Sequence, residues 1–191
     1  MTAATGQPTF YYDLGDPWSY VVAERILSEL PELAEWQPVH GAQLGWTAPE
    51  LDAGALGAAV AEHRLQPLRL PSRWPPNTRL AMLAATFAKS GGRTVGFSLA
   101  AFRQAFAGGR DLSDEATVLI AAAAAEMHPR SVLAAVGMRS VAATLRRAGD
   151  RALEAGVRAL PAIDVGDELF SGPDALERAT TALLEGVARG R

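Results

Sequence analysis

Hydrophobic and polar positions alternate over residues 8–14, and this aromatic-rich alternation predicts a β-strand. Asp16 and Pro17 follow the strand, and Asp-Pro is a favourable pair for the N-cap and first residue of a helix. Apolar residues then recur at helical spacing: Tyr20, Ala23, Ile26, Leu27 and Leu30. Residues 36–40 predict a second short strand, and Pro38 places it at a sheet edge or strand end. The chain therefore begins as β-α-β.

The middle of the chain, from about residue 47 to residue 156, is alanine-rich and contains no convincing strand pattern. Two apolar stripes at helical spacing predict core-facing helices: Leu80, Leu83, Ala84 and Phe87, then Val95, Leu99, Phe102 and Phe106. Ser113, followed by Asp114 and Glu115, predicts the start of a further helix with a cap and favourable charge. This block is predicted to be entirely helical.

Strand patterns return near the C-terminus. Residues 162–165 and 168–170 flank Gly166-Asp167, a two-residue connection that is typical of a β-hairpin. Residues 171–174 then open a last helix, whose apolar positions are Leu176, Ala179, Leu183 and Val187.

The order β-α-β, helical block, β-β-α predicts an α/β fold with a thioredoxin-like sheet of about four strands. Residues 1–46 and 157–191 would form the thioredoxin-like domain, and residues 47–156 would form an all-helical insertion domain. A chain of 191 residues with 49% hydrophobic content is long enough for this single core with its insertion.

The composition of the chain argues against several classes of function. A net charge of −3 provides no basic field for nucleic acid. No apolar run reaches the roughly 20 residues of a membrane span, and residues 1–8 do not form a signal peptide, so a soluble cytoplasmic protein is expected. His40, His63 and His128 are far apart, and their spacing predicts no metal site. The chain has no cysteine, which excludes dithiol exchange by its own side chains.

Four segments resemble the DsbA-like superfamily, and most closely its branch of 2-hydroxychromene-2-carboxylate isomerases and kappa-class glutathione transferases. They are residues 12–20, 76–79, 97–112 and 160–176. The resemblance extends over nearly the whole chain. In the segment Asp16-Pro17-Trp18-Ser19, Asp16 and Ser19 stand at the two positions where redox members of the superfamily keep cysteines.

The resemblance implies an isomerase-like or transferase-like enzyme that acts on a small organic substrate, with glutathione or another low-molecular-weight thiol as cofactor, and a homodimer. Pro161 matches the cis-proline of the fold, and the Leu160 backbone would pair with the cysteinyl part of glutathione. Asp174 matches an acidic residue that holds the γ-glutamyl amino group in glutathione-binding relatives, and Trp18 could stack on the ligand.

Asp16 has two interpretations at this stage. As a helix cap it would contribute about 1 kcal/mol to stability. As a catalytic group it would move a proton on a small carbonyl or aromatic substrate, with the Ser19 hydroxyl as hydrogen-bond donor. Activation of a thiol by Asp16 is disfavoured, because pKa values of about 3.9 and 8.5 make that proton transfer uphill by roughly 6 kcal/mol.

A second hypothesis belongs to a different class of function. The chain would be a non-catalytic binding or scaffold protein that kept the fold and lost the active site. Both hypotheses remain open from the sequence, because a fold does not determine a chemistry.

Overall fold

The computed structural model describes residues 6–45 and 51–189. The sheet contains four strands in the order β2-β1-β3-β4: β2 (Glu35–Pro38), β1 (Thr9–Tyr12), β3 (Ala162–Asp164) and β4 (Leu169–Ser171). Strand β1 pairs in parallel with β2, whereas β1 with β3 and β3 with β4 are antiparallel. These pairings confirm the predicted β-α-β and β-β-α halves, and they place the proline-containing strand at an edge.

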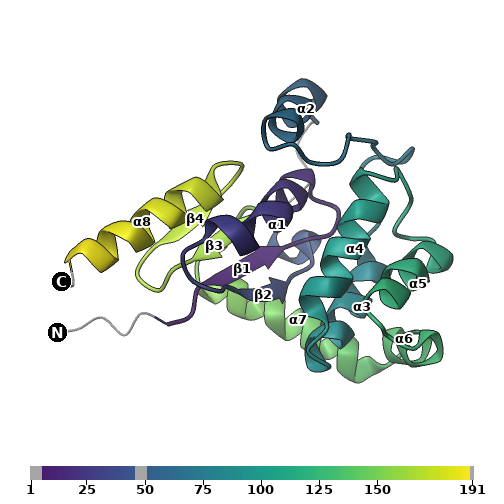
Figure 1. Cartoon of the computed structure of the whole chain (residues 1–191). Helices are drawn as coiled ribbons and strands as arrows, with labels where there is room; N and C mark the ends of the chain where they lie inside the picture. The colour runs from purple at the N-terminus through teal and green to yellow at the C-terminus, as the bar shows by residue number, and fades with distance from the viewer. Residues whose placement is uncertain (1–5, 46–50, 190–191) are drawn as a thin grey trace.

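Helices cover both faces of this sheet. Helices α1 (Pro17–Glu29) and α8 (Ala175–Arg189) lie together on one face, whereas α7 (Arg139–Glu154) packs on the other (Figure 1). Side chains alternate along β1, so Tyr12 joins the larger core while Tyr11 joins a smaller core beneath α7.

The short 3-10 helix η1 (Gly41–Leu44) follows β2. The predicted insertion consists of α7 and five further helices, and these five lie toward the β2 side of the sheet (Figure 1). They are α2 (Ala53–Glu62), α3 (Arg79–Ser90), α4 (Thr94–Phe106), α5 (Glu115–Ala124) and α6 (Pro129–Val136). The predicted domain boundary between residues 46 and 47 lies outside the described residues. No helix in the described part of the chain is long and apolar enough to cross a membrane.

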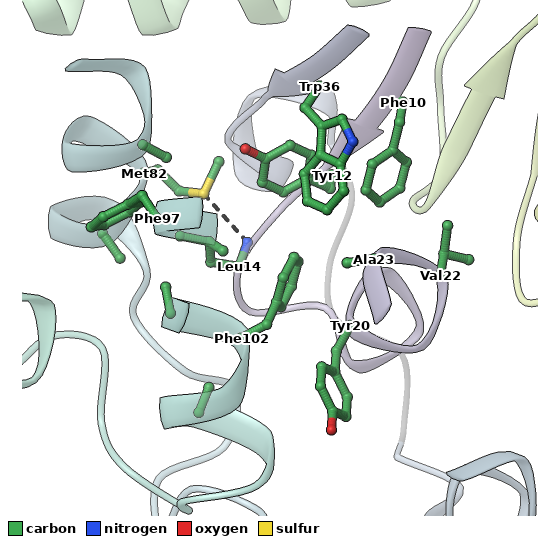
Figure 2. Close-up of a cluster of buried hydrophobic side chains, with 14 of the residues drawn as sticks. Phe10, Tyr12, Leu14, Tyr20, Val22, Ala23, Trp36, Met82, Phe97 and Phe102 are labelled. Atoms are coloured by element: carbon green, nitrogen blue, oxygen red, sulfur yellow. Dashed lines mark hydrogen bonds between the residues drawn. The ribbon is translucent and has the colours of Figure 1, made fainter. Parts of the chain in front are cut away.

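One aromatic cluster joins the sheet to the insertion. The ring of Tyr12 lies 5.6 Å from that of Trp36 on β2 and 5.7 Å from that of Phe102 on α4 (Figure 2). Close by, the Leu14 amide donates to the Met82 sulfur at 3.3 Å, drawn as the dashed line in Figure 2. The predicted stripe residue Phe102 is therefore core, and the two halves of the protein share one hydrophobic interior.

Three local predictions need correction. The N-cap of α5 is Asp114 and not Ser113, because the Asp114 carboxylate accepts the first-turn amides. Leu27 and Val187 carry the helical apolar pattern but are 50% and 51% exposed. On α1 and α8 the apolar pattern is therefore wider than the buried face.

Candidate functional site

The loop between β1 and α1 places Asp16 at the N-cap of α1, as the sequence predicted. One oxygen of Asp16 accepts the Trp18 amide at 3.3 Å, and the other accepts the Ser19 amide at 2.8 Å. The Ser19 hydroxyl also donates to the second oxygen, at 2.6 Å. Both Asp16 and Ser19 are 0% exposed. The two predicted polar residues thus form one buried carboxyl–hydroxyl pair.

Burial raises the pKa of Asp16 from 3.8 to about 7. Hydrogen bonds from Ser19 and Trp18 act in the opposite direction, and the nearby Asp13 carboxylate adds a smaller upward shift. The loss of hydration outweighs the helix-terminal donors, since a buried charge is more costly than a solvated one. The Asp16 carboxyl can therefore both hold and release a proton near neutral pH.

The N-cap of α5 provides an internal comparison. Asp114 accepts the Ala116 and Thr117 amides and the Thr117 hydroxyl, which repeats the spacing of Asp16 and Ser19. Asp114 is exposed, and these hydrogen bonds lower the pKa of its carboxyl. The same local motif thus shifts the two carboxyl pKa values in opposite directions, and burial is the difference.

Asp13 is a second buried carboxylate of this loop, and sequence reasoning missed it. It accepts hydrogen bonds from the Gly15 amide at 2.8 Å, the Gly41 amide at 2.8 Å and the Thr78 hydroxyl at 2.7 Å. These donors come from the α1 loop, the start of η1 and the residue before α3. A Cβ on Gly15 would lie 2.7 Å from Thr78 Cγ2, so only glycine fits there. The only signal in the sequence was an aspartate directly after a strand.

The cis peptide bond between Leu160 and Pro161 lies at the same end of β1. Tyr11 pairs with Ala162 in the antiparallel register, so the preceding residue, Pro161, lies beside the end of β1. The Pro161 carbonyl accepts the Gly172 amide at 2.9 Å. Within the described residues the Leu160 backbone forms no hydrogen bond, so its N–H and C=O could pair with a ligand.

The other two predicted ligand contacts differ in position. Trp18 is half-buried on the first turn of α1 and packs against the main core. Asp174 lies just before α8, and its side chain is 65% exposed and 3.7 Å from the Arg178 guanidinium. The fold thus gathers Asp16, Trp18 and Ser19, with Pro161 at the neighbouring strand end, while the Asp174 side chain faces solvent. Within the described part of the chain, no three His, Cys, Asp or Glu side chains form a metal-binding group.

Comparison with known sequences and structures places this arrangement in a family. The sequence model of the DSBA-like thioredoxin domain matches residues 9–184. The chain belongs to the DsbA-like thioredoxin domain family. A search of curated protein sequences finds no match to this DsbA-family chain. Because the chain has no cysteine, it is a member of the family without dithiol redox chemistry.

Two solved structures share nearly the whole architecture. A 2-hydroxychromene-2-carboxylate isomerase structure is similar with a TM-score of 0.86 and 16% identity, covering 97% of this chain and 98% of the isomerase chain. A probable DsbA oxidoreductase from Streptomyces coelicolor is similar with a TM-score of 0.76 and 21% identity, covering 95% and 90% of the two chains. At these identities the likeness establishes the fold, including its helical insertion.

Proposed function

We propose that this DsbA-family protein is an isomerase-like or transferase-like enzyme that acts on a small organic substrate through Asp16 and Ser19. The observation that carries the proposal is the buried carboxyl of Asp16, with a pKa of about 7 and a 2.6 Å hydrogen bond from the Ser19 hydroxyl. Proton transfer is most efficient when the pKa of the catalytic group is near the working pH.

In this proposal Asp16 is the proton carrier. An isomerisation removes a proton from one position of the substrate and returns it to another, so the enzyme needs one group that accepts and then donates it. The ionised carboxylate accepts the proton, and the protonated carboxyl returns it. The Ser19 hydroxyl orients the ionised carboxylate by donating to it. Once Asp16 is protonated, the carboxyl donates to the Ser19 oxygen instead, and the single Ser19 proton becomes available to the substrate oxygen.

The proposed cofactor is glutathione or another low-molecular-weight thiol. A charged Asp16 would repel a thiolate at the start of α1, whereas the protonated form would not. The unpaired backbone of Leu160 next to cis-Pro161 supports a ligand contact. In this proposal Trp18 and Asp174 would contact the same ligand. The homodimer and the cytoplasmic location belong to this proposal too, and light scattering of the purified protein tests the dimer.

A second candidate is a non-catalytic binding or scaffold protein, and one observation favours it. Asp16 and Ser19 are 0% exposed and already satisfy each other, so a substrate reaches them only when surrounding groups move. In this case the pair is a structural helix cap.

Two measurements separate the candidates: calorimetric titration with glutathione, and turnover of 2-hydroxychromene-2-carboxylate in its presence. The variants are Asp16→Asn, Asp16→Ser and Ser19→Ala, with Asp114→Asn as the matched cap control. Turnover that is lost in Asp16→Asn and kept in Asp114→Asn supports the enzyme. Binding by Asp16→Ser alone would show that the Asp16 charge blocks the thiol site. Neither binding nor turnover in any variant would favour the binding or scaffold protein.

A further inference from the structure

A cavity of about 440 Å³ lies between η1, the start of α3 and the side of α7, and neither Asp16 nor Ser19 lines it. Its polar lining comes from His40, Gln43, Arg79, Arg146 and Asp150. These residues belong to three segments that only the tertiary fold brings together.

The charges of this cavity are unbalanced. Arg79 and Arg146 form no ion pair or side-chain hydrogen bond within the described residues, although the protein as a whole is acidic. Among the described residues that line the cavity, Asp150 is the only carboxylate, and one of its oxygens already accepts the Gln43 amide at 2.8 Å. Two guanidinium groups therefore face one cavity that contains a single, partly satisfied carboxylate.

The position of Arg79 at the N-terminus of α3 destabilises that helix. Arg79 is the first residue of α3, where the helix dipole disfavours a cation and favours an anion. A bound anion would offset that cost and would also face the positive end of α3.

The cavity wall is held in place by specific contacts. The Gln43 amide also donates to the Arg146 carbonyl at 2.7 Å, and a Cβ on Gly149 would clash with the Gln43 carboxamide. The glycine therefore allows Gln43 to lie against α7.

Asp13 fixes the opposite side of the cavity. His40 precedes Gly41 and Arg79 follows Thr78, and both Gly41 and Thr78 donate hydrogen bonds to Asp13. Asp13 therefore holds one neighbour of His40 and one neighbour of Arg79 in place.

We propose that this cavity binds the oxyanion group of a small molecule, a carboxylate or a phosphate, through Arg79 and Arg146. A guanidinium offers planar N–H donors that match carboxylate and phosphate oxygens. The site does not depend on the chemistry of Asp16, and binding can be measured without any activity.

The test is titration of the full chain with salicylate and, separately, inorganic phosphate, each up to about 20 mM, with chloride at matched ionic strength as the reference. Arg79→Gln and Arg146→Gln are each expected to weaken binding about tenfold or more, because each removes a charged donor. Arg147→Gln is the matched control, because Arg147 is exposed on α7 and bonds Thr144 instead of lining the cavity.

NMR of the Gln43 side-chain amide tests whether the anion binds in this cavity. Its resonances should shift with the ligand in the natural protein and in Arg147→Gln, but far less in Arg146→Gln. Stronger binding of salicylate identifies an organic carboxylate site, and stronger binding of phosphate identifies a site for a phosphorylated molecule. No saturable binding above the chloride reference, or an equal loss in Arg147→Gln, would overturn the proposal.

Discussion

The Ser19 hydroxyl donates a 2.6 Å hydrogen bond to the Asp16 carboxyl, and both residues are fully buried. The exposed cap of α5 repeats this relationship, with the Thr117 hydroxyl 2.9 Å from the Asp114 carboxylate. Asp16 is buried whereas Asp114 is exposed, so of these two carboxyls only Asp16 has a raised pKa. The two caps give a matched comparison for a pH experiment.

The free energy of unfolding of the natural protein should fall with rising pH, and the Asp16→Asn variant should lack this pH dependence. The pKa of Asp16 is about 7 in the folded protein, above its ordinary value of 3.8, so the native state binds more protons between these values. The resulting stability is fully present below about pH 4 and is lost as pH rises to about 7, with a slope of up to about 1.4 kcal/mol per pH unit. Urea unfolding at pH steps across this window should show the variant gaining relative to the natural protein.

The control for that experiment is Asp114→Asn. The lowered pKa of Asp114 makes stability depend on pH in the opposite direction, because the stabilisation from Asp114 is present at neutral pH and is lost on acidification. Parallel pH profiles for Asp16→Asn and the natural protein would contradict the assigned pKa.

Thr78→Val should destabilise the protein by about 1.5–3 kcal/mol, because it removes a buried hydrogen bond to the Asp13 carboxylate while keeping the shape. Asp13→Ala should cost more, since it also leaves the Gly15 and Gly41 amides without an acceptor. Chemical denaturation gives both values. Thr144→Val, at an exposed threonine on α7, should change the free energy of unfolding much less; equal losses at both threonines would argue against the role of Asp13.

The effect of Gly149→Ala on the free energy of unfolding should be destabilising when Gln43 is present and stabilising when Gln43 is replaced by alanine. In the natural protein the new methyl group would clash with Gln43 and cost about 1–3 kcal/mol. In a Gln43→Ala background the space is free, and the same substitution should stabilise α7 by about 0.5–1 kcal/mol, the helix preference of alanine over glycine. A double-mutant cycle measured by urea unfolding tests this, and a destabilising effect in both backgrounds would contradict it.

Two buried tyrosines should respond in opposite ways to loss of the hydroxyl. Tyr12→Phe removes the 2.6 Å hydrogen bond to Ser98 and leaves that serine unpaired, so it should cost about 1–3 kcal/mol. Tyr20 has no partner for its hydroxyl within the described residues, and Figure 2 shows that hydroxyl pointing away from the other labelled side chains. Tyr20→Phe should therefore stabilise the protein by about 1 kcal/mol. Thermal unfolding of both variants decides the matter, and a loss for Tyr20→Phe would indicate an additional partner.

The sequence by itself determined the order of the elements and the local chemistry at their ends. Alternation over residues 8–14, the Asp16-Pro17 cap and the Gly166-Asp167 turn depend on neighbours within a few residues, so their geometry follows from local preferences. The lack of cysteine likewise settles, without any structure, that the chain cannot exchange a dithiol.

The tertiary structure decided which polar groups meet and which lose contact with water. Asp16 and Asp114 are the same motif in sequence, and only packing distinguishes the pKa of one from that of the other. The three donors to Asp13 and the convergence of Arg79 with Arg146 join segments that are distant along the chain. Local periodicity contains no information on such contacts, because they depend on how whole helices pack against the sheet.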